Sequence, residues 1–581
     1  MADYLIALSV GPVQGFIAAA RRTRDLWFGS YVLSEVSKAA AQVWNNQSGA
    51  QLVFPAPSNA DDLNPDSVLN VGNRILAIVS TDDPRAMLEL AKEGARTQWN
   101  ELARRARGEI AAESIDNATW EFQVNDVLEF QGAWVKLEDR QSGYGRAYKH
   151  LDRLLAARKN TRTFEPGAPA FDATPGFGKR KSSLDGARES VFTGTLTAHV
   201  RRKLGLTKGE QLDCPGVVKR LAEDPEQFPP VTRVALEAWL EQVPDEDLIE
   251  ANKALEKLCA MRLVSRVRPL RYSRLPYDGA FLFPSRIDAE EGQLEPSEAE
   301  VAKPLFRTCE GVRNALWKKY GVPSPYFGVL VADGDQMGSW ISGLDSDIKH
   351  KELSSALASF AGKAREIVER HQGACVYAGG DDVLALLPIH KAVACAEDLR
   401  QGFSTILSKS IDSSKVPTLS VGIGVGHVMT PFGRLLDLGR RAEKLAKEGA
   451  DGKGLRDALA VVVGVRSGSE FSVHGKWNQG ITERLRQWTG YFQADHLSDK
   501  TAFGLREAIR TLAWARTRPD FVDVAASEVT RVLAKKRAEA GTRELTLDVK
   551  NKVMDAIKDH GVDTIVGELL VARWLSQRVK E

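Results

Sequence analysis

Four acidic residues in two short motifs have the chemistry and spacing to bind a divalent cation. Asp333-Gly-Asp335 directly follows an apolar run, and Gly379-Gly-Asp-Asp382 separates two further apolar runs. Carboxylates from adjacent strands can converge on one magnesium ion, which neutralises phosphate charge and lowers the pKa of an attacking hydroxyl. The two motifs therefore predict phosphoryl transfer from a nucleoside triphosphate with Mg²⁺ (or Mn²⁺) at the carboxylates.

Small residues beside these carboxylates leave room for a triphosphate. Gly379 and Gly380 remove side chains where phosphates must approach the backbone. The turn from Gly334 to Gly338 opens a helix, so its free amides can hold phosphate oxygens. Lys447, on a later helix, could reach the β- and γ-phosphates, although a solvated helix lysine explains it equally well. The residues expected to bind the nucleotide are Gly334, Asp335, Gln336, Met337, Gly338, Gly379, Gly380 and Lys447.

The Gly-Gly-Asp-Asp tetrapeptide taken alone is also a good hairpin turn, because both residue types favour turns. The Asp-Gly-Asp at the end of the preceding predicted strand favours the functional interpretation. The elements around the motifs alternate as β-α-β-β-α-β, the order of a ferredoxin-like split βαβ domain. Strands are predicted over 327–332, 374–378, 383–387, 418–425 and 457–465, and helices over 352–371, 392–408 and 435–448.

The N-terminus repeats part of this pattern. Residues 4–14 align without a gap on residues 326–336, with Tyr on Tyr at one end and Gln on Gln at the other. Under that alignment Gly11 and Val13 take the places of Asp333 and Asp335. The match is consistent with a duplicated domain whose first copy lacks the carboxylates.

Composition limits which other classes of protein this chain can belong to. The 581 residues include 79 Lys plus Arg and 77 Asp plus Glu, so the net charge is only +2 and any nucleic-acid contact must come from local patches. The five cysteines form no C-x-x-C pair, which argues against a disulfide framework and an intact zinc knuckle. The N-terminal sequence lacks the basic start of a signal peptide, and no apolar stretch reaches the roughly 18 residues of a membrane span. A cytoplasmic protein is predicted.

Four stretches together resemble the large, palm-containing subunit of type III-B CRISPR effector complexes: residues 11–14, 19–27, 331–338 and 376–385. The resemblance implies an α+β fold with two ferredoxin-like palm (nucleotidyl cyclase-type) domains facing each other, a helical insert and a C-terminal helical bundle. The corresponding domains are 1–165 for a catalytically degenerate first palm, 166–310 for a mostly helical insert, 311–470 for the second palm with the Gly-Gly-Asp-Asp site, and 471–581 for the helical domain.

The same resemblance implies an activity and partners. Active members of that family join ATP into cyclic oligoadenylates when their complex binds target RNA. Two magnesium ions would then be held chiefly by Asp333, Asp381 and Asp382, with Asp381 and Asp382 central to catalysis and Asp335 orienting through its backbone. The acceptor ATP would lie against the first palm, at Gly11, Pro12 and Gln14. Expected partners are the other subunits of a type III-B complex, guide RNA and target RNA, and no membrane.

The sequence departs from the family pattern in two places. It contains no His-Asp dipeptide, so no HD-type DNase activity is expected. Where the family has C-x-x-C-G-x-R-E, this chain has Ser182 and Asp185 in place of the thiolates, so bound zinc is not expected and Cys214 is predicted to be a buried apolar residue.

Other interpretations remain open at this stage. The chain is alternatively a slow or inactive scaffold that docks guide RNA, or a free-standing nucleotide cyclase. Arg21, Arg22 and Arg24 contact RNA or a partner, or form a solvated helix face. The tryptophans among arginines near the C-terminus stack on bases, or pack in a helical core, which is the commoner situation.

Overall fold

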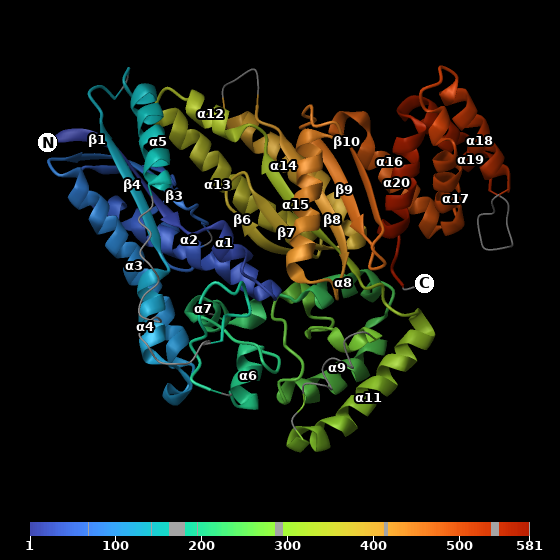
Figure 1. The fold of residues 1–581 in the computed structure, drawn as a ribbon, viewed down its shortest axis with the longest axis horizontal. Helices are drawn as coiled ribbons and strands as arrows, with labels where there is room; N and C mark the ends of the chain where they lie inside the picture. The colour runs from blue at the N-terminus through green and yellow to red at the C-terminus, as the bar shows by residue number, and fades with distance from the viewer. Residues whose placement is uncertain are drawn as a thin grey trace.

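A computed structural model describes residues 1–161, 180–284, 294, 296–411, 416–535 and 545–579, apart from positions 68, 141, 195 and 223. The fold is α+β, as predicted, with two separate β-sheets and many helices (Figure 1). The expected boundary between residues 165 and 166 lies outside the described residues.

The first sheet has four antiparallel strands in the order β2-β3-β1-β4. Successive side chains of a strand point to opposite faces, and in β1 this alternation separates two cores. Leu5 and Ala7 pack with α5, whereas Ile6 and Leu8 pack with α2 and α3. The elements of this half are β1 (Ala2–Gly11), α1 (Gln14–Ala18), α2 (Thr23–Asn45), β2 (Ala50–Phe54), β3 (Arg74–Thr81), α3 (Pro84–Gly108), α4 (Asn117–Asp126), β4 (Glu129–Lys136) and α5 (Tyr144–Asn160).

The second sheet has six strands in the order β10-β9-β8-β5-β7-β6, and only β8 and β9 run parallel. Strands β5 to β8 have the same arrangement as β1 to β4 of the first sheet. In each case the strand that comes first along the chain lies between the third and the fourth. The elements are β5 (Tyr326–Gly334), α12 (Met337–Gly343), α13 (Asp347–Arg370), β6 (Ala374–Ala378), β7 (Val383–Pro388), α14 (Ala392–Ser410), β8 (Leu419–His427), α15 (Phe432–Glu448), β9 (Ala458–Gly464) and β10 (Glu470–Lys476). The predicted strands and helices of this half are all present, whereas β10 was not predicted.

Helix α15 lies unusually close to the sheet because glycines of β8 face it. A Cβ atom at Gly422 would lie 2.0 Å from the amide nitrogen of Glu443, and one at Gly424 would lie 2.4 Å from that of Gly439. No side chain fits between the helix and the strand at these positions. The helix therefore rests on the strand backbone, which fixes its distance from the neighbouring strand β5.

The helices between the two sheets divide between two cores. Helices α6 and α7 share a core with the first sheet, where Cys214 is fully buried, as predicted. Helices α8, α9 and α11 instead pack with α15 and the second sheet, and lie together at the bottom of Figure 1. Their bounds are Ala198–Leu204 (α6), Cys214–Leu221 (α7), Val231–Leu240 (α8), Asp245–Ala260 (α9) and Pro296–Tyr320 (α11).

Hydrogen bonds connect the segment that resembles a zinc knuckle to α7. The hydroxyl of Ser182, which is buried, lies 3.1 Å from Oδ1 of Asp213. The same Asp213 oxygen accepts a 3.0 Å hydrogen bond from the amide of Gly216 in the first turn of α7. A serine and an aspartate thus hold these two segments together.

The arginine-rich turn before α2 makes contacts within the chain. Arg21 forms a 2.8 Å ion pair with Glu210, and Arg24 donates to the carbonyl of Leu204. Asp25, which is fully buried, forms a 2.8 Å ion pair with Arg220 of α7. This turn therefore joins the first half to α6 and α7.

The C-terminal helices pack against the second sheet through α16, α20 and β10. Of the tryptophans in this region, Trp477, Trp488 and Trp574 are buried, which confirms the core interpretation for these three, while Trp514 is 70% exposed. The helices are α16 (Ile481–Gln493), α17 (Asp499–Thr511), α18 (Phe521–Lys535), α19 (Leu547–His560) and α20 (Val562–Leu575). Within the described ranges, no helix has both the length and the apolar character that crossing a bilayer requires.

The glycine contact between β8 and α15 can be tested by substitution. We expect Gly424→Ala to lower the free energy of unfolding by about 1–3 kcal/mol, because the added methyl must push α15 away from the strand. Gly362→Ala in α13 is the matched control, since a Cβ there meets no atom within 4 Å. Urea denaturation compares the two. Equal stability of both variants would contradict the close packing.

Candidate active site

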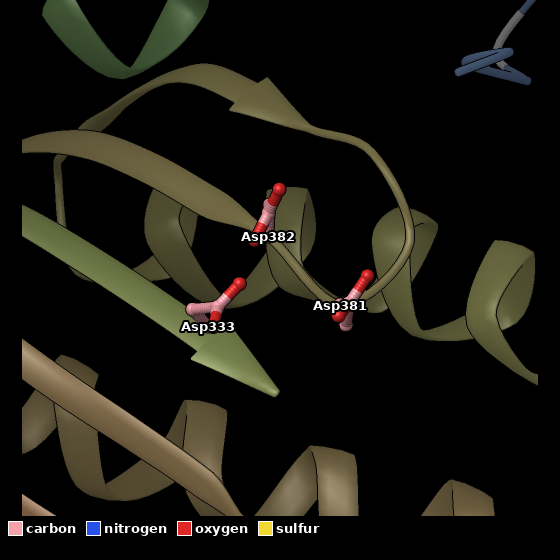
Figure 2. A group of neighbouring side chains, drawn as sticks. All are labelled: Asp333, Asp381 and Asp382. Carbon is pink, nitrogen blue, oxygen red and sulfur yellow. The ribbon is translucent and has the colours of Figure 1, made fainter. Parts of the chain in front are cut away.

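Three carboxylates converge where β5 ends and the β6–β7 hairpin turns (Figure 2). One oxygen from each of Asp333, Asp381 and Asp382 lies within 4.8 Å of the other two. Strand pairing explains the convergence, because Ala332 of β5 lies opposite Val383 of β7, and Asp333 and Asp382 are the residues next to this last pair. The structure thus brings together the two acidic motifs that the sequence indicated.

Glycines shape the backbone around the carboxylates for separate reasons. Gly380 has a φ of +98°, a conformation that side chains disfavour. A Cβ at Gly379 would lie 1.8 Å from the hydroxyl of Tyr377, and one at Gly334 would lie 2.9 Å from Cβ of Asp381. The hairpin turn therefore lies directly against the end of β5, and larger residues at these positions would separate the two motifs.

Helix α15 adds two charged groups to the site. The ammonium of Lys447 contacts Oδ2 of Asp333 and lies 2.9 Å from Oε1 of Glu443. Both side chains are only partly exposed, at 27% for Lys447 and 18% for Glu443. The predicted residue Lys447 is therefore at the site, and Glu443 is a site residue that sequence reasoning missed. The available signals were its position one helical turn before Lys447 and the Gly-x-Gly-x-Gly run of β8.

Asp335 has a different environment from the other three acidic residues. Its carboxylate accepts hydrogen bonds from the hydroxyls of Thr418 (2.6 Å) and Ser420 (2.8 Å) and from the amide of Asp457 (3.0 Å). The side chain is 4% exposed. Asp335 therefore joins the turn after β5 to the starts of β8 and β9, and its oxygens are engaged there.

The turn after Asp335 leads into α12. Gln336 adopts a left-handed conformation with φ of +58° and precedes the first helical residue, Met337, which is buried. The carbonyl of Gln336 accepts the amides of Ser339 and Trp340. The amides of Met337 and Gly338 lie in the first turn, where a helix offers them no carbonyl partner. A Cβ at Gly338 would meet nothing within 4 Å, so the space beside this turn is open.

Two family models match the chain. Residues 326–460 match "Cas10/Cmr2, second palm domain", and residues 5–104 match "CRISPR-associated protein Cmr2, N-terminal". The chain resembles the Cas10/Cmr2 family. A CRISPR system Cmr subunit Cmr2 from Pyrococcus furiosus is 24% identical over 636 aligned positions, which cover 96% of this chain and 71% of that protein. The resemblance to the large subunit of type III-B complexes is thus confirmed.

Solved structures share the fold. Type III-B Cmr-beta in its apo state has a chain with a TM-score of 0.64 and 14% identity, covering 94% of this chain and 78% of that one. Type III-B Cmr-beta bound to cognate target RNA has a chain with a TM-score of 0.64 and 13% identity, covering 99% and 83%. The Cas10/Cmr2 palm match from 326 to 460 includes all three clustered aspartates, Glu443 and Lys447.

The electrostatics of the site favour a bound cation. Burial, followed by the neighbouring Asp382, raises the pKa of Asp381 to about 7. The surrounding protein raises the pKa of Asp382 to about 6, even though part of that side chain is open to solvent. Burial together with Asp382 and Asp335 raises the pKa of Glu443 to about 7. Asp381, Asp382 and Glu443 are therefore harder to ionise than free carboxyl groups, and a divalent cation would offset that cost.

The donor set fits magnesium or manganese. Carboxylate oxygens are hard ligands that these ions prefer over nitrogen or sulfur donors. Among the described residues, Asp333, Asp381 and Asp382 are the one group of three or more potential ligand residues whose donor atoms cluster this closely. These three residues are therefore the candidate ligands, with Lys447 positioned to neutralise Asp333 when no cation is bound.

The residues expected on the acceptor side lie at the equivalent point of the first sheet. Gly11 ends β1 opposite Glu129 of β4, Pro12 follows it, and Gln14 begins α1 with an exposed side chain. Like β5, β1 runs between the third and fourth strands of its sheet, and Tyr4 begins the aligned segment in β1 as Tyr326 does in β5.

Asn70, a residue that the sequence did not indicate, connects the first half of the chain to the β6–β7 hairpin by a hydrogen bond. The side-chain amide of Asn70 donates to the carbonyl of Ala378, directly before Gly379, at 2.8 Å. Nearby, the amide of Ala56 donates to the hydroxyl of Ser354 in α13 at 3.0 Å. The loop between β2 and β3 therefore supports the β6–β7 hairpin from the first half of the chain.

The raised pKa values predict how stability depends on pH. An unfolded aspartate titrates near pH 4, so below that pH both states are protonated and the carboxylates have no effect. Between about pH 4 and 7 the unfolded state ionises while the folded state keeps its protons, so stability falls across this range, and above about pH 7 the whole loss is present. We therefore expect Asp381→Asn with Asp382→Asn to raise the melting temperature in EDTA at pH 8 by about 2 °C or more, and not at pH 4.

Magnesium provides the complementary measurement. It should raise the melting temperature of the parent protein at pH 8 and leave that of the double variant unchanged, because a ligand stabilises only the state that binds it. Asp345→Asn is the control, since Asp345 is exposed and lies outside the cluster. An equal magnesium effect on all three proteins would argue against these ligands.

Proposed function

We propose that this chain is the nucleotidyltransferase subunit of a type III-B CRISPR effector complex, and that it joins ATP into cyclic oligoadenylates when target RNA is bound. The observation that carries the proposal is the cluster of Asp333, Asp381 and Asp382 within the region that matches the second palm domain. A scaffold has no need for three carboxylates whose oxygens lie within 4.8 Å of one another.

Each group at the site has a role in the proposed reaction. Asp333, Asp381 and Asp382 would hold the divalent metal, which would supply charge neutralisation at the phosphates and a lowered pKa for the attacking 3′-hydroxyl. The open amides of Met337 and Gly338 orient the triphosphate. Lys447 exchanges its contact with Asp333 for the β- and γ-phosphate oxygens. The ribose 3′-hydroxyl gives up its proton to solvent water and its oxygen bonds to the α-phosphorus, while the bond from the α-phosphorus to the α,β-bridging oxygen breaks and pyrophosphate leaves with that oxygen.

Both sheets are proposed to be ferredoxin-like palm domains that face each other. The shared strand arrangement and the equivalent positions of β1 and β5 support this. The first palm has Gly11 where the second has Asp333, so it would bind the acceptor ATP without holding a metal. Gly11, Pro12 and Gln14 are the residues proposed to contact that acceptor. The proposed domains are 1–165, 166–310, 311–470 and 471–581.

The proposed partners are the other subunits of a type III-B complex, guide RNA and target RNA, in the cytoplasm. The Cmr2 relative is named as a subunit of a Cmr system, and one structure with the same fold is a complex bound to cognate target RNA. These names support the assignment of partners to this chain.

The first test is incubation of the purified complex with radiolabelled ATP, magnesium and matching target RNA, followed by chromatography of the products. We expect oligoadenylates only when target RNA is present. Asp381→Ala with Asp382→Ala should lower the product yield by at least about 100-fold, because the metal loses two ligands. Assembly of the complex should be unchanged.

The matched control is Glu250→Ala with Glu256→Ala, which removes two exposed carboxylates from α9. It should retain full activity. Undiminished ATP turnover in the aspartate variant would exclude the assignment, and no turnover in the parent complex would favour the scaffold.

A further inference from the structure

The outer face of α5 bears cations that form no ion pair with any residue that the structure describes. Arg146, Lys149 and Arg153 are exposed and share this face with His150 and Leu154, and the five residues line a cavity of about 580 Å³. Arg153 donates to the carbonyl of Lys149 at 3.3 Å. Among the described residues, none of these three cations contacts a carboxylate.

Unpaired cations stand out on this part of the surface. The neighbouring cations Arg74 and Arg140 pair with Asp152 (2.7 Å) and Asp3 (3.7 Å). Asp152 belongs to α5 itself, but Arg74 already engages it, and it does not line the cavity. In a chain with almost equal numbers of acidic and basic residues, this face therefore has a local positive charge without a compensating acid.

The spacing of the three cations suits a linear polyanion. With a rise of 1.5 Å per residue, Arg146 and Arg153 are separated by about 10 Å along the helix, with Lys149 between them. The positions recur every three or four residues, so the side chains project from one face. Guanidinium groups hold phosphate oxygens with two donors at once, and an ammonium serves as a point charge. The described residues lining the cavity include no Phe, Tyr or Trp, and the imidazole of His150 is their one ring.

We propose that this face of α5 binds the phosphate backbone of single-stranded RNA, with Arg146, Lys149 and Arg153 each contacting a phosphate and without base specificity. This proposal rests on the proposed function, which supplies the RNA, and it assigns one RNA contact to α5. Polyanion binding of this kind releases counterions, so its affinity falls steeply with salt. The helix is well suited to carry it, because its opposite face, including Tyr144, Tyr148 and Leu151, is buried in the first half and fixes its position.

The test uses the full-length purified chain and a fluorescein-labelled 20-residue oligouridylate, with binding followed by fluorescence anisotropy and without ATP. We expect Arg146→Gln, Lys149→Gln and Arg153→Gln together to weaken binding at least about tenfold at 50 mM salt. The slope of log affinity against log salt should fall in magnitude by about 2, since each lost phosphate contact contributes about 0.7 for a single strand. All three side chains are exposed, so the melting temperature should be unchanged.

A matched triple variant controls for net charge. Lys303→Gln, Arg307→Gln and Lys318→Gln remove three exposed cations from α11, where Glu300 and Glu310 are interspersed. We expect less than a twofold change in affinity. Equal losses in the two triple variants, or no loss in the α5 variant, would overturn the proposal. So would tighter binding of the α5 face to poly-glutamate than to oligouridylate, because the partner would then be an acidic protein. Since ATP is absent, these outcomes are independent of whether the chain is a nucleotidyltransferase.

Discussion

The direct contact of α15 with the backbone of β8 places Lys447 of α15 opposite Asp333. Gly422 and Gly424 leave no side chain between the strand and the helix, and the amides of Glu443 and Gly439 occupy that space instead. Because β8 pairs with β5, a helix resting on β8 also lies beside the end of β5. Lys447 can reach Asp333 only because of this approach. A helix held off by ordinary side chains would leave the carboxylates of the site without their nearest cation.

The same arrangement brings several carboxylates close together and keeps them from moving apart. Asp381 and Asp382 are held at the hairpin tip by strand pairing, and Glu443 is held by the helix, so none can move away from the others without disrupting the fold. Burial and mutual repulsion raise their pKa values towards neutrality. Lys447 offsets part of this charge through Asp333 and Glu443. Without a bound metal ion, these carboxylates are stabilised by protonation or by the ion pair with Lys447. A doubly charged cation would stabilise them more than either.

The sequence was sufficient for the parts of the fold in which local pattern and tertiary structure agree. The two acidic motifs and the first five strands of the second half could be predicted because each strand is a short apolar run bounded by glycine or proline. Glu443 could not, since its importance depends on how closely α15 approaches β8. Asn70 could not, because a loop residue 308 positions away from Ala378 has no local signature. The strand β10 was missed because its alternation is short and its pairing with β9 supplies most of the evidence.

Asp335 shows a further limit of reasoning from motifs. In the sequence it is one of two aspartates flanking a glycine, and both have the same chemistry. In the structure the strand's alternation sends Asp333 towards the hairpin, whereas Asp335 follows the turn inwards to the hydroxyls of Thr418 and Ser420. Residue type therefore indicated a metal site, while the geometry at the end of β5 decided which carboxylate faces it.

The first half of the chain contributes to this site through support. His350 of α13 lies between the two halves, with one ring nitrogen 2.5 Å from the hydroxyl of Tyr144 in α5 and the other 3.0 Å from the carbonyl of Ile341 in α12. Burial lowers the pKa of His350, so the neutral ring accepts from the tyrosine and donates to the carbonyl. Helix α12 begins at the turn that follows Asp335, and Asn70 holds the hairpin at Ala378. Tyr144 and Asn70 of the first half thus contact α13 and the β6–β7 hairpin, two elements of the second half that surround the carboxylates. Separating the halves would cost the buried His350 its hydrogen bond with Tyr144 and the hairpin its hydrogen bond with Asn70, so the first sheet supports the site without supplying a metal ligand.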